Sequence, residues 1–409
     1  MSERLPAAAW LSAPPTRAVI AALEAAGGAG CARFVGGCVR DTLLDRVADT
    51  LDIDIDIATP LQPPAVIAAL ETAGLRAVPT GLEHGVVTAI AFGRPFEIAT
   101  LRRDVATDGR RAVVAYTDDW AQDAARRDFR LNALYAEPAG MLHDPTGGGL
   151  ADAHAGRVAF VGEPEERIVE DYLRILRFFR FTAWYAQGAP DEAGLAACAA
   201  LKGGLARLSA ERVAKELLKL LAAPDPRPTL RVMETSGVLA EVLPEAAGLG
   251  RVDAIISLGA AADPLLRLAA LLPDDRAAVR AAAVRLRLSN AQRNRLTAAV
   301  AEGEAAPDTP AAARRMIHTL GPQAFTDRLR LAWAGRGGGV DDPVLRDLAG
   351  LAWAPPAFPV TGADIAALGV SEGPEHGRLR RELERWWVER DFTPDRDEAL
   401  AELRRLAGA

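Results

Sequence analysis

Hydrophobic and polar positions follow two different periods in the first third of the chain. Apolar residues recur at helical spacing over residues 16–27 and 63–74, which predicts two amphipathic helices. Between them, residues 52–59 read DIDIDIAT, with acids and isoleucines alternating, which predicts a strand with two unlike faces. Residues 85–104 predict two further strands joined by a tight turn. The pattern indicates a region of mixed strands and helices.

The period changes in the rest of the chain. From about residue 160 onward the apolar spacing is helical almost throughout, and alanine and leucine, both good helix formers, dominate. Clusters of proline and glycine at 223–229, 303–312 and 353–362 mark boundaries between helical groups. We therefore expect an α+β fold with three parts: a mixed-sheet head over residues 1–145, a helical neck over 146–230, and a helical body and tail over 231–409.

Composition and charge say little about the class of protein. The 409 residues are half hydrophobic and a quarter charged, as in ordinary globular proteins, and are too many for one core. The net charge is −7, so a nucleic-acid partner would need a local basic surface. Cys31, Cys38 and Cys198 are isolated, which fits neither a disulfide framework nor a zinc site. Without a run of 18 apolar residues or a signal peptide, we expect a cytoplasmic protein and no membrane partner.

The acidic side of the 52–59 strand is the first candidate for chemistry. Alternation places the carboxylates of Asp52, Asp54 and Asp56 on one face, where like charges repel one another. Carboxylates two positions apart on a strand lie about 6–7 Å apart at the backbone and can converge on Mg²⁺, which assists displacement at phosphorus. The alternative is an ordinary polar outer face of an edge strand, and the pattern leaves both open.

A glycine turn upstream makes the acidic strand more informative. In FVGGCVRD a strand runs into Gly36 and Gly37, and a helix begins at once. Exposed N–H groups at a helix start favour an anion such as a triphosphate, and Arg40, one turn further on, can reach the same phosphates. A tight turn without any ligand would give the same local sequence.

The order of short motifs resembles that of one enzyme family. GGCVRD followed by DIDIAT resembles the first motif of the class II tRNA nucleotidyltransferases and bacterial poly(A) polymerases, which belong to the polymerase β-like nucleotidyltransferase superfamily. RRDFRLNAL is similar to the family's RRDFTINAL, with Arg130 where threonine is usual. Further segments that resemble family motifs follow in order and bring the resemblance to about half the chain: 144–152, 170–181, 208–221 and 358–384.

The resemblance implies a metal site in the head. Its D-x-D motif directly precedes an AT pair, which selects Asp54 and Asp56 as ligands of catalytic Mg²⁺ and leaves Asp52 as a neighbour. Glu97 is a candidate third carboxylate, and an exposed strand residue is its alternative role.

The resemblance also places base recognition on residues 170–181, EDYLRILRFFRF. Asp171, Arg174, Arg177 and Arg180 recur every three residues, a spacing that groups them on one side of a helix. By resemblance Asp171 and Arg174 pair with the base edge, and Arg177 and Arg180 lie near the triphosphate. A carboxylate accepts from an exocyclic amino group and a guanidinium donates to a ring nitrogen, which suits cytosine and adenine. An ordinary solvated charged face is the alternative.

Three further roles follow from the resemblance. Gly37, Arg40 and Arg127 are expected to bind the triphosphate, with Asp128 holding Arg127, unless Asp128 forms only an intrahelical salt bridge. The charge-rich segment 102–120 is expected to be a solvated loop, and by resemblance the mobile element that helps switch between nucleotides.

These features favour CCA addition to tRNA, and the resemblance implies that the helical body and tail over 231–409 bind the tRNA acceptor arm. An RNA 3′-hydroxyl attacks the α-phosphate of CTP or ATP, and pyrophosphate leaves. Alternatives within the class are a poly(A) polymerase and an enzyme that adds only CC or only A. The short, charge-balanced end DEALAELRRLAGA and the element TGADIAALGV favour CCA addition over poly(A) synthesis. A non-catalytic tRNA-binding relative is the alternative from another class, and the Asp54/Asp56 pair disfavours it.

Overall fold

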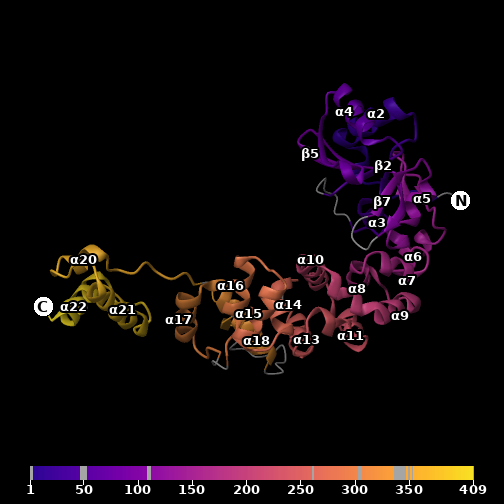
Figure 1. The fold of residues 1–409 in the computed structure, drawn as a ribbon. Helices are drawn as coiled ribbons and strands as arrows, with labels where there is room; N and C mark the ends of the chain where they lie inside the picture. The colour runs from indigo at the N-terminus through magenta and orange to yellow at the C-terminus, as the bar shows by residue number, and fades with distance from the viewer. Residues whose placement is uncertain are drawn as a thin grey trace. The chain divides into compact units, whose positions relative to one another are not determined.

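The chain forms two compact units, residues 1–244 and residues 245–409, as seen in a computed structural model (Figure 1). The structure describes residues 3–46, 53–107, 112–259, 262–302, 306–335, 347–348, 351 and 353–408. The first unit contains both the head and the neck expected from the sequence, and the finer three-part division stays a prediction.

A mixed sheet forms the centre of the first unit. Among the described residues it has seven strands in the order β3-β4-β5-β2-β1-β8-β9. They are β1 Arg33–Val35, β2 Asp56–Thr59, β3 Arg76–Gly81, β4 Val86–Ala91, β5 Arg94–Thr100, β8 Tyr135–Ala136 and β9 Leu142–His143. β2 runs parallel to β5 and antiparallel to β1. The predicted pair of strands over 85–104 is β4 and β5, which Phe92 and Gly93 join in a turn where both have positive φ.

Short helices pack against this sheet. They are α1 Ala9–Ser12, α2 Pro14–Gly27, α3 Gly37–Leu43, α4 Pro63–Thr72, α5 Trp120–Ala125 and α6 Gly149–Ala155, with 3₁₀ turns η1 Leu82–His84 and η2 Arg130–Asn132. α2 and α4 contact each other and β4, and Leu23, Leu70 and Val87 on these elements are buried. Both helices have proline in the first turn, where the missing N–H would have no partner anyway. The two helices predicted from periodicity are therefore confirmed.

The acidic strand is shorter than its sequence pattern. β2 begins at Asp56, so Asp54 precedes the strand, and Asp52 lies outside the described residues. Ile55 and Ile57 are buried while Asp54 is exposed, which confirms the alternation over the described positions. The ladder begins one residue before the strand, because Glu97 N donates to Ile55 O at 3.1 Å.

Segment 102–120 is not the continuous loop that its charge suggested. β6 Arg102–Thr107 and β7 Ala112–Tyr116 pair as an antiparallel ribbon apart from the main sheet. The run AVVAY is rich in residues that favour strands, and this preference prevails over the surrounding charge.

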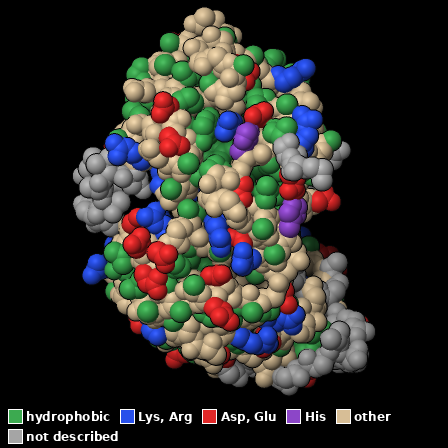
Figure 2. Space-filling model, turned by 90° about the vertical axis from the view of Figure 1, so that its right-hand side faces the viewer, with side chains coloured by type: hydrophobic (Ala, Val, Ile, Leu, Met, Phe, Trp, Pro, Cys, Tyr) green, Lys and Arg blue, Asp and Glu red, His purple; other side chains and the backbone are tan. Residues whose placement is uncertain are grey.

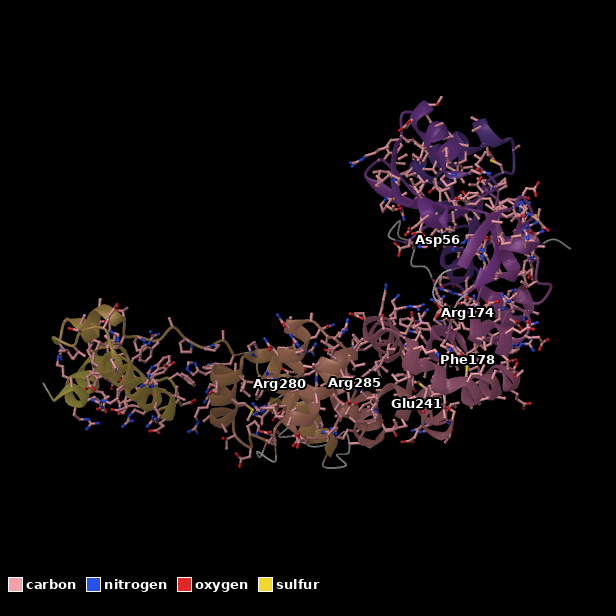
Figure 3. All side chains as sticks on the ribbon, in the orientation of Figure 1. Asp56, Arg174, Phe178, Glu241, Arg280 and Arg285 are labelled. Atoms are coloured by element: carbon pink, nitrogen blue, oxygen red, sulfur yellow. The ribbon has the colours of Figure 1, made fainter. Side chains whose placement is uncertain are left out.

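The neck is helical and shares an aromatic core with the head. Its elements are α7 Pro164–Glu170, α8 Leu173–Tyr185, α9 Glu192–Leu201, η3 Lys202–Arg207, α10 Ala210–Leu221, α11 Arg227–Thr235 and α12 Val238–Val242. Phe129 of the RRDF motif lies 4.9 Å from Phe160 and 5.2 Å from Phe181 between ring centroids. Phe178, labelled in Figure 3, stacks on Phe160 at 5.6 Å. This shared core packs the neck helices against the head that contains the mixed sheet.

The secondary-structure elements of the second unit are all helices among the described residues. Its helices are α13 Gly250–Ser257, α14 Pro264–Leu271, α15 Arg276–Arg285, α16 Asn290–Ala299, α17 Pro310–Leu320, α18 Pro322–Gly335, α20 Gly362–Ala366, α21 Pro374–Glu389 and α22 Arg396–Ala407. One apolar cluster centres on Phe325 and Leu329, and another on Leu379 and Leu403. The α+β fold with an all-helical second half is confirmed.

Surface charge is mixed rather than of one sign on the face that Figure 2 draws, where basic and acidic side chains are interspersed. Of the helices in the described ranges, none is long and apolar enough to cross a membrane.

Candidate active site

Three carboxylates lie on or next to two interior strands of the sheet, β2 and β5. Asp56 opens β2, and Glu97 of β5 is its direct partner in the parallel register, so both side chains project from the same face. Asp54 stands two residues before Asp56, and its charge acts on the Asp56 carboxyl. Figure 3 labels Asp56 within the head. The two aspartates singled out in the sequence are therefore close enough for their charges to interact.

The negative charge of these carboxylates is only partly offset, by the positive charge of Arg127. Burial raises the pKa of Asp56 to about 6, helped by the negative charges of Glu97 and Asp54 and opposed by Arg127. In the described part of the chain, the carboxylates of Asp54, Asp56 and Glu97 make no hydrogen bond or ion pair. Repelling oxygen ligands without a protein partner fit a hard divalent cation.

Among the described residues, Asp54, Asp56 and Glu97 do not form a three-carboxylate metal cluster. Across the described ranges, no three His, Cys, Asp or Glu side chains are gathered at metal-binding distance. Asp54 and Asp56 thus remain the ligand candidates, and a metal role for Glu97 stays a prediction.

The glycine turn lies directly beside the acids. Gly36 follows β1 with φ 75° and ψ −127°, a conformation that favours glycine, and α3 begins at Gly37. A Cβ on Gly36 would lie 3.7 Å from Asp56 Oδ2 and 4.0 Å from Arg127 Nη1. The turn therefore places bare backbone between the carboxylates and a buried arginine.

Arg40 is buried beside this turn, since a Cβ on Gly37 would lie 3.8 Å from its Nη2, but its guanidinium is already bonded to other side chains. Its Nη1 donates to Asn132 Oδ1 at 2.5 Å and its Nη2 to the Tyr185 hydroxyl at 2.7 Å, while Asp41 pairs with the rest of the guanidinium. It joins α3 to α8. A phosphate would have to displace these partners, and its predicted role as a phosphate ligand is untested.

Two nitrogens of the Arg127 guanidinium, Nε and Nη2, have hydrogen-bond partners, and Nη1 has none among the described residues. Its Nε donates to the Tyr135 hydroxyl at 3.2 Å and its Nη2 to Asp123 Oδ2 at 3.1 Å. Tyr135 in turn donates to Asp123 Oδ2 at 2.7 Å. Burial would raise the pKa of Asp123, but Arg127, Arg126 and Tyr135 hold it below its usual range. Nη1, the remaining edge, lies toward Gly36.

The sequence predicted that Asp128 holds Arg127 in place, but Asp123 forms that ion pair. Asp128 is buried and accepts from Arg177 Nε at 2.7 Å and from Asn132 Nδ2 at 3.1 Å. Burial would raise the pKa of Asp128, but Arg177 and these hydrogen bonds keep it low. Asp123, which sequence reasoning missed, stands four residues before Arg127, and that helical spacing was the available signal.

Residues 170–181 are not one continuous helix. α7 ends at Glu170, Asp171 is extended, and α8 begins at Leu173. The break has a local cause, because Asp171 Oδ1 accepts from Leu173 N at 3.1 Å, a bond that competes with helix continuation. Asp171 Oδ2 accepts from Arg212 of α10 at 2.6 Å.

The three arginines of this segment pair mainly with different carboxylates, although Arg177 also lies 3.9 Å from Glu216, the partner of Arg180. Arg174, labelled in Figure 3, donates to Glu170 Oε2 at 2.6 Å and to Arg126 O at 3.1 Å. Arg177 pairs with Asp128, and Arg180 pairs with buried Glu216 of α10. Arg174 therefore reaches the residue next to Arg127, whereas Arg177 and Arg180 tie α8 to its neighbours. Their roles toward a nucleotide stay predictions.

Comparisons with known proteins agree with this arrangement. A family model described as the poly A polymerase head domain matches residues 32–159. Another, described as a probable RNA and SrmB binding site of polymerase A, matches residues 189–249. The mouse protein named CCA tRNA nucleotidyltransferase 1, mitochondrial, is 34% identical over 391 residues, which span 91% of this chain and 86% of the mouse chain.

Solved structures share the fold. The Bacillus stearothermophilus CCA-adding enzyme in complex with CTP matches with a TM-score of 0.76 at 24% identity, covering 97% of this chain and 98% of that one. The Thermotoga maritima CCA-adding enzyme complexed with tRNA matches with a TM-score of 0.62 at 20% identity, covering 92% and 91%.

A mixed sheet that presents paired acids beside a glycine turn, continued by helices alone, is the architecture of a polymerase β-like nucleotidyltransferase. Enzymes of that superfamily generally use a divalent metal. The identity with the mouse protein is more specific: this chain belongs to the CCA tRNA nucleotidyltransferase family.

Proposed function

We propose that this protein adds C, C and A to the 3′ end of tRNA, using CTP and ATP and releasing pyrophosphate. The observation that carries the proposal is the Asp56 carboxylate, which has no ion-pair partner among the described residues, is acted on by Asp54, and lies beside Gly36 and Nη1 of Arg127. The near-full-length likeness to a CCA tRNA nucleotidyltransferase indicates that the reaction is CCA addition to tRNA.

Positions of the side chains suggest a division of labour. Asp54 and Asp56 would hold Mg²⁺, which when bound neutralises charge on the reacting phosphate. Arg127 Nη1 and the backbone at Gly36–Gly37 offer N–H donors to a triphosphate on the same side. Arg174 bonds Arg126 O, so the base-reading pair lies beside the phosphate-binding arginine. Catalysis then consists mainly of holding the nucleotide in line with the RNA 3′-hydroxyl.

The direct test is extension of a tRNA transcript that lacks its CCA end. With Mg²⁺, CTP and ATP we expect the sequenced products to end in C-C-A, and we expect chelation by EDTA to stop the reaction until Mg²⁺ is restored. Long A tracts would indicate a poly(A) polymerase, and products ending in CC or in a single A would indicate a partial enzyme. Absence of any extension would favour a non-catalytic tRNA-binding relative.

Asp171→Asn should relax the choice of nucleotide. Asp171 uses one lone pair on Leu173 N and one on Arg212, which leaves two carboxylate acceptor sites for an exocyclic amino group. Asparagine presents a donor as well, so the ratio of CTP to UTP incorporation should fall about tenfold or more, since a bidentate base contact is worth about 1–3 kcal/mol. Incorporation from competing nucleotides measures the ratio.

Arg212→Ala is the matched control for that variant. It removes the same ion pair but keeps the Asp171 carboxylate. We expect Arg212→Ala to retain selectivity; an equal loss in both variants would show that the ion pair, not base reading, sets the choice.

The cytoplasmic location also stays a prediction, because the mouse relative carries a mitochondrial designation in its name.

A further inference from the structure

Phe92 is the most exposed large hydrophobic side chain among the described residues. Its exposed fraction is 77%, whereas Leu82, Tyr116, Val169 and Val284 reach at most 51%. A single hydrophobic residue on a protein surface is common, so exposure alone does not indicate a ligand. The backbone conformation at Phe92 and its place in the sheet are more informative.

The backbone at Phe92 is unfavourable for this type of residue. Phe92 and Gly93 form the two-residue turn between β4 and β5, with Ala91 paired to Arg94. φ is 52° at Phe92 and 79° at Gly93. Asparagine or aspartate ordinarily precedes the glycine in such a turn, because these residues tolerate positive φ. A phenylalanine there is strained, since its Cβ crowds the following carbonyl oxygen.

Phe392 shows how tertiary packing can compensate for the same strain. Its φ is 63°, and its ring lies 4.8 Å from that of Trp353 and 5.0 Å from that of Trp387 between centroids. Within the described ranges, by contrast, Phe92 makes no ring contact and its side chain faces solvent. Packing therefore explains the positive φ of Phe392 but not that of Phe92.

The turn lies at the end of the sheet where the acidic residues are. β5 runs parallel to β2, so its first residue, Arg94, lies at the end where β2 begins; Figure 1 labels both strands. Arg94 Nη2 donates to Ile53 O at 2.8 Å, which fastens the turn to the residue before Asp54. Phe92 is five residues from Glu97, so their Cα atoms are at most about 17 Å apart.

We propose that Phe92 is a stacking platform for an unpaired base near the 3′ end of the tRNA. The proposal rests on the proposed function, which brings an RNA 3′-hydroxyl to Asp54 and Asp56. An aromatic side chain can stack on any base, because every base has a π-face. Phe92 is thus a positioning residue: it holds the RNA strand a short distance from the acids and takes no part in the chemistry.

The first test compares two variants of the full-length protein. We expect Phe92→Asn to raise the KM for a tRNA lacking its CCA end about tenfold, as the loss of one stacked base predicts, and to leave the KM for CTP within about twofold. Its melting temperature should equal or exceed that of wild type, because asparagine suits the turn. Phe92→Tyr keeps the ring and should retain the wild-type KM for tRNA.

A second measurement isolates stacking from other contacts. Equilibrium affinity is measured for tRNA transcripts in which one unpaired 3′ nucleotide at a time is replaced by an abasic ribose. Wild type should bind one of these transcripts about tenfold more weakly than the intact transcript. Phe92→Asn should bind the same two transcripts equally, because the stacking partner is already missing.

Three results would overturn the proposal: a wild-type KM for tRNA in Phe92→Asn, an equal rise in Phe92→Tyr, or the same abasic penalty in wild type and Phe92→Asn. The binding measurement needs no turnover, so it also separates this proposal from the proposed function. A wild-type protein that shows the Phe92-dependent abasic penalty but does not extend the tRNA would refute the proposed function and leave the stacking role standing.

Discussion

Asp56→Asn should abolish nucleotide addition, with a loss of roughly 10³-fold or more in kcat/KM for both CTP and ATP. The Asp56 carboxylate is ionisable, half-buried and without a hydrogen-bonding partner among the described residues, so its charge has no structural use that the fold reveals. Asparagine keeps the shape but is a far weaker ligand for a divalent cation. Steady-state incorporation into a tRNA lacking its CCA end measures the loss.

Glu97→Gln is the matched control, since Glu97 is the register partner of Asp56 on β5 and the change removes the same charge from the same face. If Asp54 and Asp56 are the ligand pair, Glu97→Gln should keep activity within a few-fold of wild type. A loss as large as that of Asp56→Asn would make Glu97 a third ligand.

Folding should not suffer in Asp56→Asn. Removing one of three repelling charges relieves strain in the folded state, so the melting temperature should stay at or above that of wild type. Activity retained in Asp56→Asn would contradict the metal assignment, and a variant that loses activity only because it unfolds would be recognised by its melting curve.

The candidate pair Asp54 and Asp56 could be predicted from the sequence because the signals for it lie within one short stretch of the chain. Alternation along one strand decides which face Asp54 and Asp56 occupy, and the glycine turn is close to them in the chain. What brings Glu97 beside Asp56 is the parallel pairing of β2 with β5, and no local pattern contains that register.

The partners of the arginines at 174, 177 and 180 could not be predicted from the sequence of this segment alone. Equal spacing suggested that these side chains share one helical face, but their ion-pair partners come from elsewhere in the fold. Asp128 of the head takes Arg177, and Glu216 of α10 takes Arg180. Their ion pairs depend on the packing of α8 between the head and α10, which spacing within a single segment cannot reveal.

The contacts that position Arg127 could be predicted only in part, because one follows from sequence spacing and the other from tertiary packing. Its helical spacing to Asp123 is visible in the sequence, whereas the approach of Tyr135 from β8 is a result of tertiary packing. Asp128 is adjacent to Arg127 in sequence, yet it turns away because Arg177 and Asn132 satisfy it.

Arg127→Lys should lower kcat/KM for CTP and ATP alike by about 10²-fold, which corresponds to about 2.7 kcal/mol of transition-state stabilisation. A guanidinium can bond Tyr135 through Nε and Asp123 through Nη2 while Nη1 still lies toward Gly36. A lysine keeps the charge but is a single point donor and cannot fill these three positions together. Because the phosphates are common to both nucleotides, the loss should not depend on the base.

Tyr135→Phe separates the positioning of Arg127 from its charge. It removes the hydroxyl that accepts from Arg127 Nε and donates to Asp123, yet leaves the arginine and its Asp123 ion pair in place. We expect a loss of about tenfold or less in kcat/KM, in the range of one hydrogen bond, equal for CTP and ATP and expressed mainly as a higher KM for the nucleotide. Steady-state kinetics with each nucleotide would test the pair of variants: wild-type kcat/KM in Arg127→Lys would remove Arg127 from the phosphate site, and a loss confined to one nucleotide would move it to base selection.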